Sequence, residues 1–282
     1  IQGPDLLRAM DKSSPRVEIL AHPDVRRMLL LQKCHAEGMR ALCFYAASLQ
    51  DQRELHAATD HKKSEALERR NDLLLPLVKG YCSEKAYEML SLSLQCFGGS
   101  GYLQDYPIEQ YIRDQKIDTL YEGTTHIQAL DLLLRKVARD GGQLLRELLA
   151  EAQATIASEE GGADLADARA ALGKALENLQ GMLMALLGKM GESLYHVGLQ
   201  GNRVLMSLAE VMVSWLLIKQ AALSQTKLAA LPEGAESERA FYTGKIYAAR
   251  FFATQVLPHI SIERRLVESS ELSLMSFPNE AF

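Results

Sequence analysis

The residue types best suited to chemistry in this sequence lie in one short stretch, between positions 95 and 128. The stretch holds a glycine-rich turn at Gly98-Gly99 and, further on, a carboxylate beside another glycine, Glu122-Gly123. Glycines that end a helix expose backbone N–H groups, which can bind the phosphates of a ligand. A carboxylate fixed where two helices meet can act as a general base. Each pattern alone is more often a helix cap or a tight turn, so neither assigns a role by itself.

Helices must position these residues, because the chain consists of long segments with helical periodicity. Hydrophobic residues make up 48% of the chain and charged residues 24%. Thr124 is suited to cap a helix that follows Glu122-Gly123. We expect helices over residues 22–56, 73–97, 107–120, 124–137, 144–157, 163–190, 202–231 and 237–267, with a charged surface stretch over 60–72.

These segments predict an all-α protein with two units. Residues 1–140 are expected to form a four-helix up-and-down bundle, because short connections favour antiparallel packing of neighbouring helices. Residues 141–282 also consist of long segments with helical periodicity and are expected to form a second helical bundle. The pair Gly141-Gly142 marks the junction between the two units.

Charge and apolar content exclude several classes of partner. The net charge is -5 and the sequence has no basic stripe, so we expect neither nucleic acid nor an anionic membrane surface as a partner. The most apolar stretch, Val211 to Ile218, is shorter than the ~20 residues that a membrane span needs. Four cysteines lie far apart in the sequence without metal-ligand spacing. We therefore expect free thiols in a reducing compartment and no metal site.

The segment from Gln95 to Gln128 resembles the signature of the acyl-CoA dehydrogenase family. It reads QCFGGSGYLQDYPIEQYIRDQKIDTLYEGTTHIQ. The family has Gln-x-x-Gly-Gly-x-Gly-[Tyr/Phe], then Tyr-Pro, Arg-Asp and Tyr-Glu-Gly-Thr at this spacing. The resemblance identifies residues 1–140 with the C-terminal helical domain of such a flavoenzyme. Residues 141–282 resemble the C-terminal extension of a subgroup that includes enzymes similar to 3-methylmercaptopropionyl-CoA dehydrogenase.

The resemblance implies a role for each matching residue. Glu122 would be the base that removes the α-proton of an acyl-CoA thioester, while the β-hydride passes to N5 of FAD and a trans-2-enoyl-CoA forms. Tyr121 and Gly123 match residues that line the acyl pocket. Many members have glutamine where this chain has His126. The residues that match FAD contacts are Gln95, Gly98, Gly99, Thr124 and His126.

The same resemblance carries expectations about the whole enzyme. Family members have an N-terminal helical domain and a middle β-domain that are not seen here, so we expect a fragment that is inactive alone. It starts at Ile1 without an initiator methionine, which suggests trypsin-like cleavage or deliberate isolation of a domain. An electron-transfer flavoprotein is the expected acceptor, a homodimer or homotetramer the expected assembly, and the bacterial cytoplasm, ahead of the mitochondrial matrix, the expected location.

The sequence is also compatible with two other functions. An acyl-CoA oxidase-like flavoenzyme would share the signature, because the sequence does not show whether oxygen reaches the flavin. A non-catalytic helical scaffold would keep the bundle without the activity. The retention of Glu122 between Tyr121 and Gly123 argues against the scaffold, which has no need of an acid at such a junction.

Overall fold

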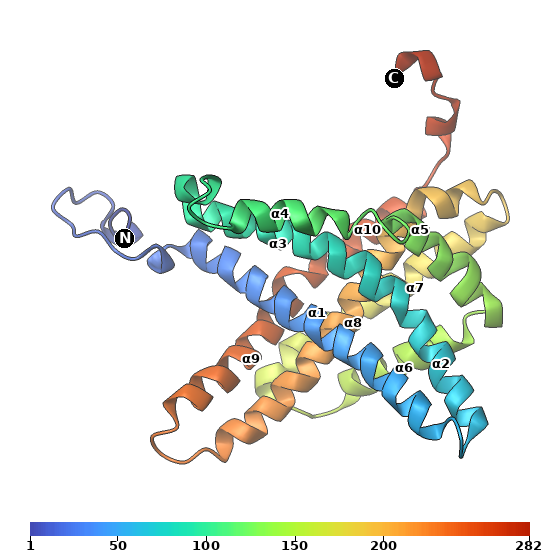
Figure 1. Cartoon of the computed structure of the whole chain (residues 1–282), viewed down its shortest axis with the longest axis horizontal. Coiled ribbons are helices and arrows are strands. Elements are labelled where there is room, and N and C mark those ends of the chain that lie inside the picture. The colour runs from blue at the N-terminus through green and yellow to red at the C-terminus, as the bar shows by residue number, and fades with distance from the viewer.

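The computed structural model describes all 282 residues and contains ten α-helices (Figure 1). Apart from one isolated antiparallel bridge between Pro4 and Arg16, it has no β-structure. The predicted all-α fold is therefore confirmed. The helices are α1 (Pro23–His56), α2 (His61–Pro76), α3 (Cys82–Phe97), α4 (Ile108–Ile117), α5 (Thr125–Leu130), α6 (Gln143–Ala157), α7 (Ala166–Met190), α8 (Tyr195–Ala229), α9 (Glu236–Gln255) and α10 (Ile260–Glu268).

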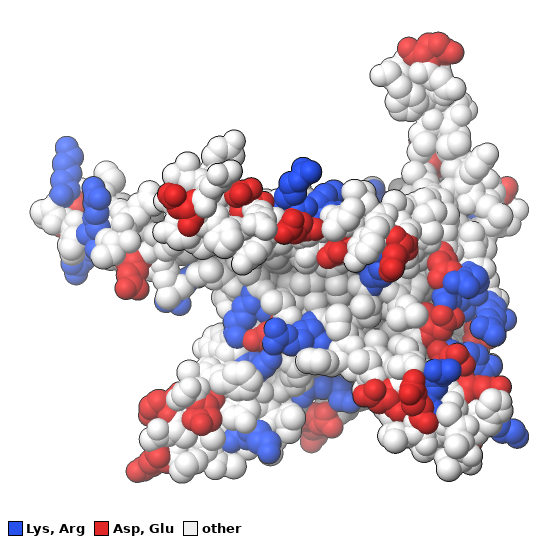
Figure 2. Space-filling model, viewed as in Figure 1, with Lys and Arg blue, Asp and Glu red and all other residues white.

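The two ends of the chain project from the helical body (Figure 1). The segment before α1 folds back on itself, with the Gln2 N–H donating to the Val17 carbonyl at 2.9 Å. His22 Nε2 bonds the Gln2 carbonyl oxygen at 2.7 Å and anchors this segment at the start of α1. On the face shown in Figure 2, acidic and basic side chains lie intermixed over the helices.

α2 and α3 form a rod that is interrupted by a single irregular turn. Asp60 caps α2, because its carboxylate accepts a hydrogen bond from the Lys63 N–H at 3.0 Å. Residues 61–72, predicted only as a charged surface stretch, are therefore helical. Pro76 has no N–H for the helical ladder, and a π-helical turn, Leu77–Tyr81, follows it before α3 begins. This turn carries Lys79 to the candidate site.

α8 is the central helix of the fold. It packs against α1, α7 and α9, and one apolar core runs from Leu42 on α1 through Leu205 on α8 to Phe252 on α9. By length and composition α8 could cross a membrane, but 78% of its most apolar window is buried within the fold, as in the core helix of a bundle. The two halves thus share one core, and the division near residue 140 stays a prediction.

Several helix boundaries differ from the predicted ones: α4 ends at Ile117, and α5 gives way to a π-helical turn, Asp131–Val137. α8 begins at Tyr195 rather than near Asn202, and His196 in its first turn is already buried. The helix predicted over residues 237–267 is interrupted at Pro258, which has no N–H to continue the ladder of α9. The interruption places His259 between α9 and α10, where it meets α8.

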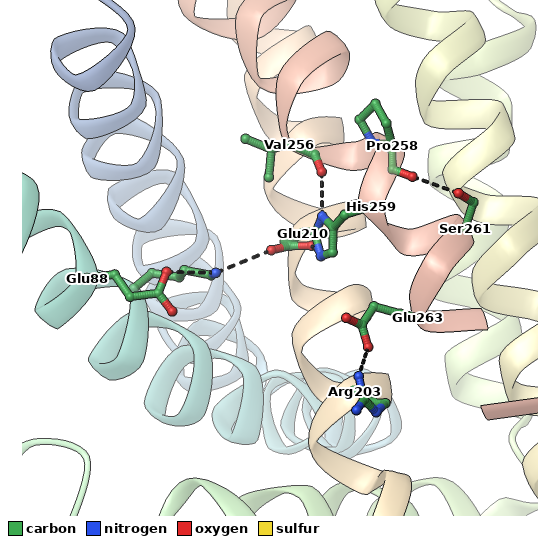
Figure 3. A network of polar contacts seen from close by, with 9 residues as sticks. Glu88, Arg203, Glu210, Val256, Pro258, His259, Ser261 and Glu263 are labelled. Atoms are coloured by element: carbon green, nitrogen blue, oxygen red, sulfur yellow. Dashed lines mark hydrogen bonds and ion pairs between the residues drawn. The ribbon is translucent and has the colours of Figure 1, made fainter. Parts of the chain in front are cut away.

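Glu210, in the middle of α8, is a buried carboxylate with ionic partners on other elements (Figure 3). Its Oε2 atom lies 3.1 Å from Nε2 of His259, and its Oε1 atom lies 3.8 Å from Nζ of Lys85 on α3. The other ring nitrogen of His259, Nδ1, bonds the Val256 carbonyl oxygen at 2.6 Å. The hydrogen bond with Glu210 raises the pKa of His259 to about 8.

We expect the substitution His259→Gln to lower the free energy of unfolding by about 1 kcal/mol near pH 6 and by almost nothing near pH 9. The folded-state pKa of His259, about 8, lies above its ordinary value of 6.5. The stabilisation is therefore complete below about pH 6.5 and is lost as the pH rises through about 8. Because the side chain is 41% exposed, solvent screening holds the effect below what the pKa shift alone would give.

Urea unfolding of the parent and the variant at both pH values measures this effect. The control is His61→Gln on α2, where the histidine is 81% exposed and little change is expected at either pH. A loss of stability in His259→Gln that is the same at both pH values would assign the effect to packing rather than to the charge on His259.

Candidate functional site

The turn between α4 and α5, residues 118–124, carries the candidate base. Glu122 has φ 54°, and it is the only residue other than glycine with a positive φ. Gly123 follows with φ 88°. A side chain in the left-handed region costs roughly 1 kcal/mol or more, and such strain persists only where the surroundings enforce it. The turn is therefore a fixed feature rather than a loose connection.

Three hydrogen bonds hold this turn against the α2–α3 rod and α5. Lys79 Nζ donates to the Gly123 carbonyl at 2.6 Å, and Gln128 Nε2 donates to the Glu122 carbonyl at 3.1 Å. At the start of α5, the Thr125 hydroxyl donates to a Glu84 carboxylate oxygen at 2.5 Å. Lys79 was not among the predicted site residues. A lysine within an apolar run such as LLLPLVKGY is nevertheless typical of a half-buried cation that has a partner.

The turn lines a cavity of about 340 Å³ between α1, α3 and α4. Its wall includes Tyr121 and Glu122 from the turn, Lys79 from the π-helical turn and Asp118 after α4. The Tyr121 side chain is exposed, and a hydrogen bond with Asp118 raises the pKa of its hydroxyl. The backbone N–H of Glu122 has no acceptor within the chain. Glu122 thus combines a carboxylate with a free backbone N–H donor. Removal of a proton α to a carbonyl requires a base for the proton and a donor for the carbonyl oxygen.

The residues predicted to contact FAD fall into two groups. Thr124 and His126 follow Glu122 directly, in the turn and at the start of α5. Gln95, Gly98 and Gly99 lie at the far end of α3, about 20 Å along the helix from its start near Glu122. The chain therefore brings Thr124 and His126 to the catalytic turn and keeps the glycine-rich turn away from it.

The glycine-rich turn is exposed, and a ligand can approach its backbone closely. Gln95 and both glycines are exposed, and a Cβ added at Gly98 or Gly99 would meet nothing within 4 Å. At Gly98 the backbone has φ 62°, a conformation that favours glycine. At Gly99 no contact within the chain requires the absence of a side chain. Bare backbone of this kind can approach a phosphate more closely than a residue with a side chain allows.

The structure also brings two cysteines together in the cavity wall. Cys43 on α1 and Cys82 at the start of α3 both line this wall. Interaction with the Cys82 thiol lowers the pKa of Cys43 to about 7, and interaction with Cys43 raises the pKa of Cys82. All four cysteines are free, as predicted, but the placement of Cys43 and Cys82 in one wall could not be predicted, because 39 positions separate them in the sequence.

Two protein families match the chain, one in each half. The model described as "Acyl-CoA dehydrogenase, C-terminal domain" matches residues 8–137. The model described as "Acetyl-CoA dehydrogenase C-terminal like" matches residues 148–278. Residues 138–147 lie between the two matched ranges.

Curated relatives match over nearly the whole chain. The broad-specificity linear acyl-CoA dehydrogenase FadE5 of Mycobacterium tuberculosis is 47% identical over 100% of this chain and 47% of its own length. The 3-methylmercaptopropionyl-CoA dehydrogenase of Ruegeria pomeroyi is 35% identical over 92% of this chain and 43% of its own length, in keeping with the predicted subgroup. The chain thus spans less than half the length of these relatives.

Solved structures share the fold at low sequence identity. ACDH-11 of Caenorhabditis elegans, in complex with C11-CoA, aligns with a TM-score of 0.65 at 22% identity, over 93% of this chain and 43% of that one. An acyl-CoA dehydrogenase of Bacillus anthracis, complexed with FAD, aligns with a TM-score of 0.63 at 16% identity, over 96% of this chain and 46% of that one.

Proposed function

Because this chain belongs to the acyl-CoA dehydrogenase family, we propose that it supplies the catalytic base of an FAD-dependent enzyme that oxidises the Cα–Cβ bond of an acyl-CoA thioester. The observation that carries the proposal is Glu122 itself. It is held in a left-handed turn, beside a cavity, with its own N–H free of any acceptor in the chain. In this role the carboxylate receives the α-proton and the N–H binds the thioester carbonyl oxygen.

The two functions of Glu122 support each other chemically. An α-proton of a thioester is weakly acidic, so its removal needs stabilisation of the negative charge that grows on the carbonyl oxygen. A backbone donor fixed by the turn provides this without reorganisation. Tyr121 and Gly123 flank the base as walls of the acyl pocket. The Gly123 carbonyl accepts a hydrogen bond from Lys79, which fixes the backbone next to the base.

FAD is the group that would accept the β-hydride. The residues of this chain fit contact with it in the two groups described above. Gln95, Gly98 and Gly99 would hold its diphosphate and adenosine portion from a neighbouring copy of the chain, as the resemblance to the family signature implies. Thr124 and His126 would hold the part of FAD nearest their own Glu122. This arrangement requires a homodimer or homotetramer.

Several features of the whole enzyme belong to the same proposal. The relatives are more than twice as long as this chain, and we propose that their additional segments complete the flavin and CoA sites, so that residues 1–282 are inactive alone. An electron-transfer flavoprotein would reoxidise the flavin. The two relatives described above are bacterial, which favours the bacterial cytoplasm as the location.

The test is anaerobic reduction of bound flavin by a panel of acyl-CoAs, with the chain in a protein of the relatives' full length. Loss of the oxidised flavin absorbance with one or more acyl-CoAs is the expected result, and the rates rank the substrates. Rapid reoxidation by air without an added acceptor would indicate an acyl-CoA oxidase instead. Absence of flavin from the purified protein would favour a non-catalytic scaffold.

We expect Lys79→Met to lower kcat about tenfold with little change in KM. Lys79 donates to the Gly123 carbonyl, so its removal loosens the turn that aims Glu122, and methionine keeps a side chain of similar length in the cavity wall. Lys79→Arg keeps a donor and should recover most of the rate. Steady-state kinetics of the three proteins measure the effect. A rise in KM without a fall in kcat would show that Lys79 serves substrate binding and not the position of the base.

A further inference from the structure

Residues 271–282 form an arm that projects from the helical body (Figure 1). Two short 3-10 turns, Ser273–Ser276 and Asn279–Ala281, shape the arm, and the hydrogen bonds that its residues make stay within it. Large apolar side chains that are exposed together gain free energy when another surface covers them. The arm exposes four such side chains, which are Leu274, Met275, Phe277 and Phe282.

The root of the arm is fixed to the fold. Ser270, which directly precedes the arm, is buried and takes part in three hydrogen bonds with α7 and α8. Lys189 Nζ donates to its carbonyl at 2.7 Å, Gln200 Nε2 donates to its hydroxyl oxygen at 3.0 Å, and His196 Nδ1 lies 3.0 Å from the same oxygen. The fold therefore sets the direction in which the arm leaves the body.

An apolar groove opens beside this root. It has a volume of about 660 Å³ and lies between the π-helical turn Asp131–Val137, α6 and α7. Its wall includes Met190, which directly follows Lys189, the residue that anchors the arm. Met184 and Leu187 in the same wall are exposed, so no part of the chain covers them. Each copy of the chain thus carries an uncovered apolar groove next to the root of an uncovered apolar arm.

We propose that the arm of one copy of the chain docks in the groove of a second copy, whose own arm docks in the groove of the first. In Figure 1 the arm runs away from α6, which forms one wall of the groove in the same copy. A two-fold axis near the roots brings each arm to the groove of the other copy. Fully extended, the 12 residues of the arm span up to about 40 Å, which allows such a crossing.

The charges of the two surfaces are complementary. The arm contains two acidic residues, Glu271 and Glu280, and no basic residue. Arg146 is the only charged residue in the wall of the groove, and its guanidinium bonds the Gly141 carbonyl rather than a carboxylate. The carboxylate of nearby Asp140 already accepts two backbone N–H bonds at the start of α6. An acidic apolar segment therefore suits this groove better than a basic one.

The size of the two surfaces also fits an interface between copies. The arm has 12 residues and 16 residues line the groove, so each copy contributes 28 residues, within the about 20–30 per side of a specific interface. The exchange needs neither flavin nor acyl-CoA, so it does not rest on the proposed function of Glu122. Assembly through FAD alone would leave the arm without a partner, and the two proposals can fail separately.

Photo-crosslinking tests the exchange in a protein of the relatives' full length that contains this chain. The photoreactive residue p-benzoyl-phenylalanine replaces Phe277, which is exposed, and the irradiated protein is separated by denaturing electrophoresis. A bond between copies gives a band with the mass of two chains, whereas a bond within one copy does not. We expect the two-chain band, in which the tryptic peptide that begins at Leu266 is joined to peptide 175–189 of α7.

Two variants of exposed side chains provide a matched comparison. Met184→Glu places a carboxylate in the wall of the groove, and its repulsion of the acidic arm should lower the yield of the two-chain band at least about fivefold. Leu223→Glu places the same charge at an exposed leucine of α8 outside this wall, and it should leave the yield unchanged. An unchanged yield in Met184→Glu would contradict docking in the groove.

The crosslinking pattern of the protein with unaltered groove residues can overturn the proposal by itself. A one-chain product linked to peptide 175–189 would mean that the arm folds onto its own copy. Links from position 277 to any other region, or no link at all, contradict the exchange as well. A two-chain product in a protein that no acyl-CoA reduces would keep the exchange and reject only the proposed function of Glu122.

Discussion

Replacement of Glu122 by glutamine is expected to slow the reduction of flavin by an acyl-CoA about a thousandfold, with little change in the affinity for the thioester. Glutamine has the size of glutamate and keeps the backbone N–H that would bind the carbonyl oxygen, but its amide does not accept the α-proton. The turn should survive, because its hydrogen bonds from Lys79 and Gln128 go to backbone carbonyls. Stopped-flow absorbance under anaerobic conditions gives the rate, and spectral titration of the oxidised flavin gives Kd.

Asp118→Asn is the matched control, because Asp118 is a second carboxylate in the same cavity wall. It lies beside the Tyr121 hydroxyl, and we expect its amide variant to keep at least about a tenth of the parent rate. A thousandfold loss in Asp118→Asn together with near-normal reduction in Glu122→Gln would reassign the base to Asp118. Comparable small effects in both would mean that neither carboxylate removes the proton.

Gly38→Val is expected to lower the free energy of unfolding by about 3 kcal/mol. Gly38 is a buried position on α1 where the helix crosses α8. A Cβ built at this glycine would lie 2.3 Å from Cγ1 of Val213 and 3.4 Å from Cδ1 of Leu217. Val213 is β-branched and has few alternative rotamers, so the two helices have to separate to admit the new side chain. Chemical denaturation monitored by circular dichroism measures the loss.

The control for helix propensity is Gly188→Ala on α7. This glycine is exposed, and a Cβ there would meet nothing within 4 Å. Alanine should stabilise the protein by about 0.5 to 1 kcal/mol, because it removes the unfavourable propensity of glycine in a helix. A loss smaller than about 1 kcal/mol in Gly38→Val would show that α1 and α8 can adjust their spacing at little cost.

The helical fold could be predicted from the sequence, but not all of the breaks between its helices could. Periodicity and helix caps placed α1 and α6 within a residue of their observed bounds, because those signals are local. Pro258 was included in a continuous helix, although its missing N–H interrupts the helical ladder, and the contact of His259 with Glu210 beside the break joins residues far apart in the sequence. The helical character of residues 61–72 was also missed, since a charged segment looks the same whether or not a partner helix covers one side.

The candidate site was predictable where a motif covers it and not where tertiary contacts build it. Glu122, Tyr121 and Gly123 are contiguous, so their resemblance to the family signature could be read directly. Their predicted roles await the experiments above. Lys79 is 44 positions from Gly123, and Cys43 and Cys82 line one cavity wall from two helices. Residue spacing along the sequence does not predict such contacts between distant residues.

The shared core limits how this chain can change over evolutionary time. α8 belongs to the second half of the sequence, but its Val213 side chain fills the space that Gly38 leaves on α1, in the first half. A larger residue at position 38 is tolerable only with a smaller one at position 213, so the two halves have to accumulate such substitutions together. Loss of the second half from this chain would leave the inner face of α1 uncovered, so it would have to be accompanied by substitutions on that face of α1.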